Sequence, residues 1–62
     1  MLAEILTPDE AALFLRVNAS TLKYWRTQGV GPPYIALSNN RVRYHLDDLD
    51  QWLLDRTEVP AV

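Results

Sequence analysis

Two short segments of this 62-residue sequence carry the side chains best suited to binding chemistry. Lys23 and Arg26 lie three residues apart in the first segment, and Arg41 and Arg43 lie two residues apart in the second. Ammonium and guanidinium groups donate hydrogen bonds to phosphates and to the acceptor atoms of guanine. The pattern therefore indicates that the chain binds an anion, and a nucleic acid is the natural candidate.

The charges are distributed unevenly along the chain. Residues 11–46 carry five basic residues and no acidic one, whereas residues 1–10 sum to −3 and residues 47–62 to −4, which leaves a formal net charge of −2. Such a dipolar pattern can steer one face toward an anion while the acidic remainder limits indiscriminate binding. Small proteins also acquire uneven charge by chance, so the distribution alone favours neither explanation.

The first basic segment is predicted to lie on a helix over residues 19–28. Asn18 is a favourable N-cap, and Gly29 suits the left-handed residue that ends a helix. Leu22 and Trp25 face inward on this helix. The opposite arc is basic and polar and contains no acid, so that it could contact bases and phosphates; an ordinary solvated face is the alternative. Its residues are Ser20, Thr21, Lys23, Tyr24, Arg26 and Thr27.

The second basic segment is predicted to lie on a β-hairpin. Residues 34–37 and 41–44 have the composition of strands, and Asn39 and Asn40 suit the turn between them. Arg41 and Arg43 then project to the same side, about 7 Å apart at the rise of a strand. With the two asparagines they form a candidate wing that touches phosphates or enters a minor groove. The alternative is an edge strand that charge protects against aggregation.

Two further helices complete the expected frame. Thr7, Pro8 and Glu10 form a capping box with proline at the first helical position, so a helix should run from there to about Leu15. Residues 16–18 form a turn. A third helix should begin near His45 or Leu46, and residues 57–62 should be a frayed tail. The expected fold is α+β, mainly α: a helix-turn-helix, a two-stranded hairpin and a C-terminal helix in one domain over residues 1–62, with its folded part at about 5–56.

The hydrophobic pattern predicts one core shared by all of these elements. Leu13 and Leu54 lie off the main apolar stripes, and we expect them to pack within the molecule. The expected core residues are Leu6, Ala12, Leu15, Val17, Leu22, Trp25, Ile35, Val42, Leu46, Leu49, Trp52 and Leu53.

Composition argues against several classes of protein. The chain has no cysteine and one histidine, so no zinc finger, disulfide framework or other metal site is expected. No apolar run approaches the roughly 20 residues of a membrane span. Ser20 and Thr21 have no neighbouring base that would make them nucleophiles. We therefore expect no catalytic residue, no cofactor and no enzymatic activity, and a location in the cytoplasm at the nucleoid of a bacterial host.

Taken together, these motifs resemble the MerR-like, excisionase-type DNA-binding domains. The similarity covers residues 5–54. It is carried by the helix start at residues 6–12, the segments 15–18 and 20–26, Gly29, the hairpin segments 32–35 and 41–44, and the pairs 48–49 and 52–53. It implies a winged helix-turn-helix with its second helix in the major groove and its wing on the adjacent minor groove or backbone. Arg16 occupies a turn position where many members have glycine, and it could reach a phosphate.

The resemblance also implies a function and partners. The first hypothesis is a phage or prophage excisionase, a recombination directionality factor that binds and bends double-stranded attachment-site DNA and directs a phage integrase toward excision. Head-to-tail self-association on DNA would accompany it, without a small-molecule effector. The second hypothesis is a MerR-like or AlpA-like transcriptional regulator. A third is a protein-interaction module such as an antirepressor, which would use Leu13, Leu54 and the acidic third helix.

Overall fold

A computed structural model describes residues 4–58 of the chain. It contains the three expected helices, α1 (Pro8–Leu15), α2 (Ala19–Gln28) and α3 (Leu46–Arg56). Between α2 and α3 lies the expected hairpin of β2 (Ile35–Ser38) and β3 (Arg41–His45). The α+β class and the winged helix-turn-helix order are thereby confirmed. Of the predicted tail, Thr57 and Glu58 are exposed and outside any helix, and the rest lies outside the described residues.

A third strand, β1 (Ile5–Leu6), extends the predicted hairpin to a three-stranded antiparallel sheet. Strand order is β1-β3-β2, and β1 pairs Ile5 with His45 and Leu6 with Tyr44. The amide of Leu46 also donates to the carbonyl of Glu4 at 3.0 Å. The sequence pattern predicted the hairpin but not this additional strand. A strand of two residues is too short to show alternation, and its pairing with β3 rather than its own sequence makes it extended.

Local chemistry sets the start and end of α1. The Thr7 side chain accepts from the amide of Glu10 at 3.2 Å, and the Glu10 carboxylate accepts from the amide of Thr7 at 2.8 Å. This is the predicted capping box. The helix ends at Leu15, and its C-cap residue Arg16 has a left-handed φ of 62°. The amide of Val17 donates to the carbonyl of Ala12 at 3.0 Å. The chain reverses at this point and enters α2.

The predicted bounds of α2 are also confirmed, with one difference in its cap. Asn18 occupies the N-cap position in an extended conformation, but its side chain makes no capping hydrogen bond. Its backbone carbonyl accepts from the amides of Thr21 and Leu22 instead. At the other end Gly29 is left-handed, with φ of 73°. Gly31 follows with φ of 89°, and a Cβ there would lie 3.0 Å from the Cβ of Trp25.

The core lies where the three helices meet the sheet. Its fully enclosed side chains include Tyr44, Leu22 and Leu49, and Ala11 and Ala12 let α1 approach its neighbours closely. Ala11 and Tyr44 were not in the expected core. Leu15, Val17, Trp25, Val42 and Leu46 are partly buried and pack against it as expected.

Three leucines are more exposed than the sequence predicted. Leu53, an expected core residue, is 37% exposed. It lies one turn after the buried Leu49 on the same face of α3, at the exposed C-terminal end of the helix. Leu13 is 73% and Leu54 61% exposed, so the expectation that they pack within the molecule was wrong. Leu13 and Leu54 each lie on the side of their helix opposite to its buried residues.

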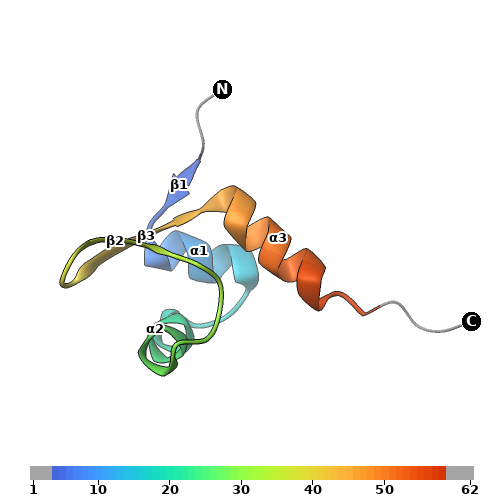
Figure 1. The fold of residues 1–62 in the computed structure, drawn as a ribbon, viewed down its shortest axis with the longest axis horizontal. Helices are drawn as coiled ribbons and strands as arrows, with labels where there is room; N and C mark the ends of the chain where they lie inside the picture. The colour runs from blue at the N-terminus through green and yellow to red at the C-terminus, as the bar shows by residue number, and fades with distance from the viewer. Residues whose placement is uncertain (1–3, 59–62) are drawn as a thin grey trace, which may run out of the picture.

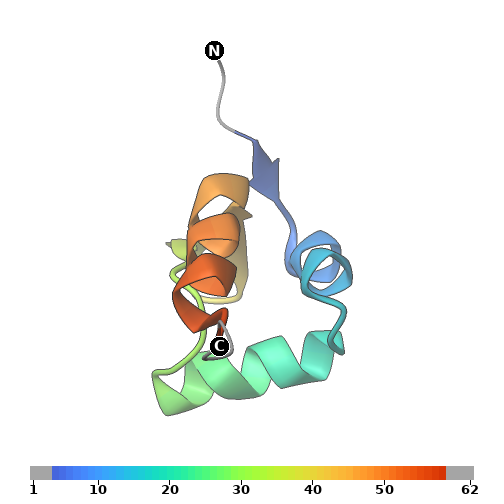
Figure 2. The same ribbon diagram turned by 90° about the vertical axis from the view of Figure 1, so that its right-hand side faces the viewer.

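The hairpin and α3 extend to opposite sides of the molecule (Figure 1). In Figure 1 the β2–β3 hairpin lies to the left and α3 to the right, with α1 between them. Turned by 90°, the molecule shows α2 crossing below both α1 and α3 (Figure 2). Among residues 4–58, no helix has the length and apolar character to cross a membrane.

Candidate nucleic-acid interface

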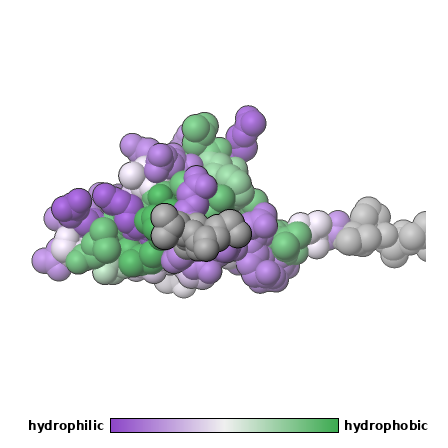
Figure 3. All heavy atoms as spheres, turned by 90° about the horizontal axis from the view of Figure 1, so that it is seen from above, coloured by the Kyte–Doolittle hydropathy of each residue, from purple (hydrophilic) through white to green (hydrophobic). Residues whose placement is uncertain are grey.

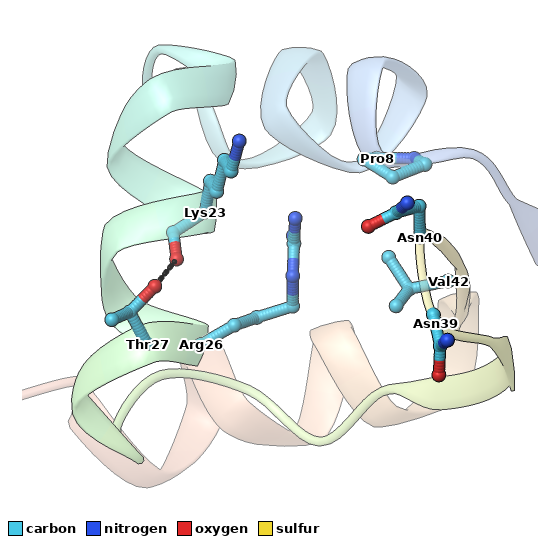
Figure 4. A pocket seen from close by; sticks show the side chains of 7 residues that line it. All are labelled: Pro8, Lys23, Arg26, Thr27, Asn39, Asn40 and Val42. Atoms are coloured by element: carbon cyan, nitrogen blue, oxygen red, sulfur yellow. Dashed lines mark hydrogen bonds between the residues drawn. The ribbon is translucent and has the colours of Figure 1, made fainter.

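A cleft of about 450 Å³ lies between α2 and the β2–β3 hairpin. Figure 4 shows side chains from α2 on one side, the hairpin on the other, and the start of α1 closing a third side. Five of the seven residues that line it are among the predicted DNA contacts. The lining residues are Pro8, Lys23, Arg26, Thr27, Asn39, Asn40 and Val42.

The α2 side of the cleft presents a cation and a hydroxyl. Lys23 and Thr27 are exposed and lie one turn apart, as residues four apart on a helix do. The Thr27 hydroxyl donates to the carbonyl of Lys23 at 3.0 Å. Its hydrogen is therefore already used, and its oxygen is left as an acceptor toward the cleft. Lys23 keeps its ammonium group for an outside acceptor.

Arg26 differs from the free surface arginine that the helix pattern suggested. Its side chain is half-buried, and its Nη1 donates to the Tyr44 hydroxyl at 2.8 Å. Its Cζ also lies 6.0 Å from the centre of the Tyr34 ring, and the Tyr34 and Tyr44 rings are 6.2 Å apart. In Figure 4 the guanidinium points into the space between α2 and the hairpin. The Tyr44 hydroxyl on β3 thus holds an arginine from α2, and the Tyr34 ring lies beside it.

The hairpin side of the cleft is formed by its turn. Asn39 and Asn40 occupy the turn as predicted, and both are exposed. Their amides can donate as well as accept hydrogen bonds, so they suit either phosphate or base edges. Neither Arg41 nor Arg43 lines this cleft, so the structure does not bring all predicted basic residues to one place.

Arg41 and Arg43 lie on β3 in unequal surroundings. Arg41 is exposed next to the turn. Arg43 is half-buried, and its Nη1 donates to the carbonyl of Val42 at 2.7 Å. One of the two cations is therefore free to move, and the other is partly held by its own backbone.

An irregularity in the hairpin exposes a leucine near the turn. Ala36 pairs with Val42 and Ser38 with Arg41, so Leu37 is an extra residue in β2. A bulge of this kind redirects side chains at a strand end. Leu37 is 56% exposed beside the turn of the hairpin. Seen from above, the molecule shows hydrophilic residues gathered at its hairpin end with hydrophobic residues among them (Figure 3).

The remaining predicted contacts lie outside the cleft. Ser20 and Tyr24 are exposed on α2, with Tyr24 at 60%, and Thr21 is half-buried near the start of the helix. Arg16 is exposed at the turn between α1 and α2. These residues extend the polar surface from the cleft along α2 toward its N-terminus.

Sequence reasoning missed the residues that support the cleft. Tyr44 and Val42 were placed on the apolar side of the hairpin, but nothing in the pattern linked Tyr44 to Arg26. That link depends on an eighteen-residue separation in sequence that the fold closes. The alternation of β3 did contain one usable signal, because it put the Tyr44 ring on the face opposite to Arg41 and Arg43.

The opposite side of the molecule has an acidic character. A second hollow of about 290 Å³ lies beside α3, where the Arg56 Cζ sits 4.0 Å from the centre of the Trp52 ring. The lining residues of the hollow are Gly31, Pro33, Asp48, Gln51, Trp52, Asp55 and Arg56.

His45 is the N-cap residue of α3, in agreement with the helix start predicted there. No group of three metal-ligating side chains occurs within residues 4–58.

Residues 5–57 match the model of a family described as a helix-turn-helix domain. The match includes every helix and strand of the described structure. No protein of curated function matches the chain in sequence.

Proposed function

The chain belongs to the helix-turn-helix domain family, and from this premise we propose how it binds DNA. Family membership supports sequence-specific binding to double-stranded DNA. In the proposed arrangement α2 enters the major groove, whose width admits one helix. The β2–β3 hairpin acts as the wing and contacts the neighbouring backbone or minor groove.

The observation that carries this arrangement is the cleft between α2 and the hairpin. It gathers Lys23, Arg26, Asn39 and Asn40 from two separate parts of the sequence. Cationic and amide donors of this kind are among the groups by which proteins bind the DNA backbone. Its lining residues contain no carboxylate. No lining carboxylate opposes the attraction of Lys23 and Arg26 for an anion such as a phosphate.

The acidic residues support the same orientation. Five of the eight acidic residues follow residue 46, and four of these five lie on α3. Asp9 and Glu10 lie in the first turn of α1 next to the cleft, where the Glu10 carboxylate accepts a hydrogen bond from the Thr7 amide. Helix α3 extends away from the hairpin on the far side of the molecule (Figure 1). A field of this polarity turns the cleft toward DNA and α3 away from it.

At a finer level, we favour an excisionase, which would bind and bend attachment-site DNA and direct an integrase toward excision. This role rests on the resemblance of residues 5–54 and on the exposed Leu37 beside the wing turn. Apolar side chains at a minor groove can separate base steps and kink the duplex. A single module buries only about 600–1,000 Å² on DNA, so several protomers on adjacent sites would provide useful affinity.

Two other functions remain to be separated by experiment. A transcriptional regulator would use the same cleft and wing but would bind at a promoter instead of an attachment site. A protein-interaction module is favoured by one observation, the exposed Leu13 and Leu54 on α1 and α3. It predicts that loss of Lys23 leaves function intact, whereas a polar residue at Leu13 abolishes it.

The test is a fluorescence-anisotropy titration against duplexes selected from a random pool and against unselected duplex, at about 50 and about 200 mM salt. We expect tighter binding to the selected duplex, weakening with salt. Lys23→Ala should reduce the preference between duplexes by roughly 1–3 kcal/mol if Lys23 reads a base. Arg56→Ala is the matched control, because it removes one cation from the acidic side. Absence of binding to any duplex at low salt would overturn the proposal.

A further inference from the structure

The hydrogen bond between Arg26 and Tyr44 connects the protein core to the cleft. Within residues 4–58, two hydrogen bonds join side chains, and the other one, between Gln51 and Asp55, lies inside α3. The Arg26–Tyr44 bond alone among them crosses from one element to another, from α2 to β3. Tyr44 is fully buried, whereas Arg26 reaches the surface of the cleft.

The geometry leaves most of the Arg26 guanidinium free for a ligand. A guanidinium has five N–H donors in one plane, and the Tyr44 hydroxyl occupies one of them. The Tyr34 ring, 6.0 Å from Cζ, limits the positions that the group can take. The guanidinium itself extends into the space between α2 and the hairpin turn (Figure 4). The group is therefore oriented before any ligand arrives.

A phosphate of DNA is the ligand that this placement fits best. When a helix occupies the major groove and a wing the adjacent minor groove, the sugar–phosphate strand between the grooves passes between the two elements. The cleft lies between α2 and the hairpin, and Lys23 and Asn40 flank Arg26 there. Guanidinium groups bind phosphate oxygens through two parallel hydrogen bonds, which requires a fixed plane.

We propose that Tyr44 is a positioning residue that holds the Arg26 guanidinium ready to clamp the DNA phosphate crossing the cleft. This inference rests on the proposed function and adds to it a role for a buried residue that touches no DNA. A long, flexible side chain loses conformational freedom when it binds, and this loss opposes association. The hydrogen bond to Tyr44 removes that freedom during folding, so that the loss no longer weakens binding.

The test compares Tyr44→Phe with Tyr34→Phe. Tyr44→Phe keeps the buried ring and removes only the hydroxyl that accepts from Arg26. Tyr34→Phe is the matched control, because its ring stays beside Arg26. With duplex of mixed sequence, Tyr44→Phe should weaken binding about three- to tenfold, the range expected for ordering one side chain. The salt dependence should be unchanged, because Arg26 keeps its charge. Tyr34→Phe should bind like the wild type.

A double variant separates this role from a purely structural one. Arg26→Ala should lower the slope of log affinity against log salt by about 0.9, which corresponds to one lost phosphate contact. In that background Tyr44→Phe should have no further effect on affinity. If it weakens binding equally with and without Arg26, Tyr44 acts through the fold and the inference is wrong. Circular dichroism at the assay temperature verifies that each variant is folded.

Nuclear magnetic resonance of the free protein tests the positioning step without DNA. The Arg26 guanidinium protons should give separate, slowly exchanging signals in the wild type and averaged signals in Tyr44→Phe. Averaged signals in the wild type would overturn the inference and leave the proposed function standing. Equal DNA affinity of the wild type and Tyr44→Phe would also overturn the inference and leave the proposed function standing. A wild type that binds no DNA would overturn both.

Discussion

The ring centroids of Trp25 and Trp52 lie 5.5 Å apart with an interplanar angle of 43°, and this contact joins α2 to α3. Tilted aromatic pairs at this separation contribute about 0.5–1.5 kcal/mol beyond the area that they bury. Gly31 also packs against Trp25, where an added Cβ would be only 3.0 Å from the Trp25 Cβ. Helix α2, which lines the cleft, thus packs against α3, which carries four of the eight acidic residues.

Trp25→Ala should therefore unfold most of the protein under conditions where the wild type is folded. Truncation of a packed tryptophan costs about 3–5 kcal/mol, and small domains have only about 5–15 kcal/mol of stability in total. A urea titration followed by circular dichroism measures the change. Tyr24→Ala is the control, because Tyr24 is 60% exposed on the same helix and should shift stability by under about 0.5 kcal/mol. Equal losses in both variants would contradict the packing role of Trp25.

Arg16→Gly should stabilise the protein. Arg16 has φ of 62°, and this left-handed conformation costs a residue with a Cβ roughly 1–2 kcal/mol. Glycine avoids that cost but gains freedom in the unfolded chain, so the net stabilisation should be about 1 kcal/mol. For a domain of this size, that raises Tm by about 4–8 °C, which calorimetry detects.

Gly29→Ala provides the reciprocal control for Arg16→Gly. Gly29 has φ of 73°, and nothing lies within 4 Å of the position of an added Cβ. Its substitution therefore introduces backbone strain without a steric clash and should lower Tm by a similar amount. A fall in Tm for both variants would show that Arg16 makes stabilising contacts that outweigh its strain.

Arg41 and Arg43 should affect DNA binding similarly but protein stability differently. If each contacts one phosphate, each alanine substitution lowers the slope of log affinity against log salt by about 0.9. Arg43 also donates to the carbonyl of Val42, so Arg43→Ala should cost about 1 kcal/mol of stability, whereas Arg41→Ala should cost almost none. Anisotropy titrations at several salt concentrations and urea titrations measure the two effects. An unchanged slope in the double variant would refute the assignment of the hairpin as a wing.

Local sequence chemistry was sufficient to predict the helices. Thr7 and Glu10 cap one another at short range, and Gly29 adopts the conformation that its missing Cβ allows, so neither depends on the rest of the fold. Strand β1 could not be predicted in this way. Its two residues are extended because Leu6 pairs with Tyr44, almost forty positions later in the chain.

The composition of the candidate site was largely predictable, but its internal geometry was not. A helical wheel placed Lys23 and Thr27 on the outward face, and both line the cleft. The same wheel could not indicate that Tyr44 would hold the neighbouring Arg26, because that contact depends on where the sheet lies relative to α2. Long-range contacts decide which cation is fixed and which is free.

Leu37→Ser should reduce DNA bending while leaving the electrostatic part of binding intact. Leu37 is the extra residue between the Ala36–Val42 and Ser38–Arg41 pairs, and more than half of its side chain is exposed beside the hairpin turn. If the hairpin lies at a minor groove, this side chain is placed to enter a base step and kink the duplex, most easily at a flexible TA step. Energy transfer between dyes at the two ends of a duplex measures the bend. We expect a smaller bend with Leu37→Ser and an unchanged salt slope, because no charge is removed.

Leu13→Ser is the control, since it also removes an exposed leucine but lies on α1, away from the cleft lining. Equal bending by the wild type and Leu37→Ser would show that the bulge does not act as a wedge.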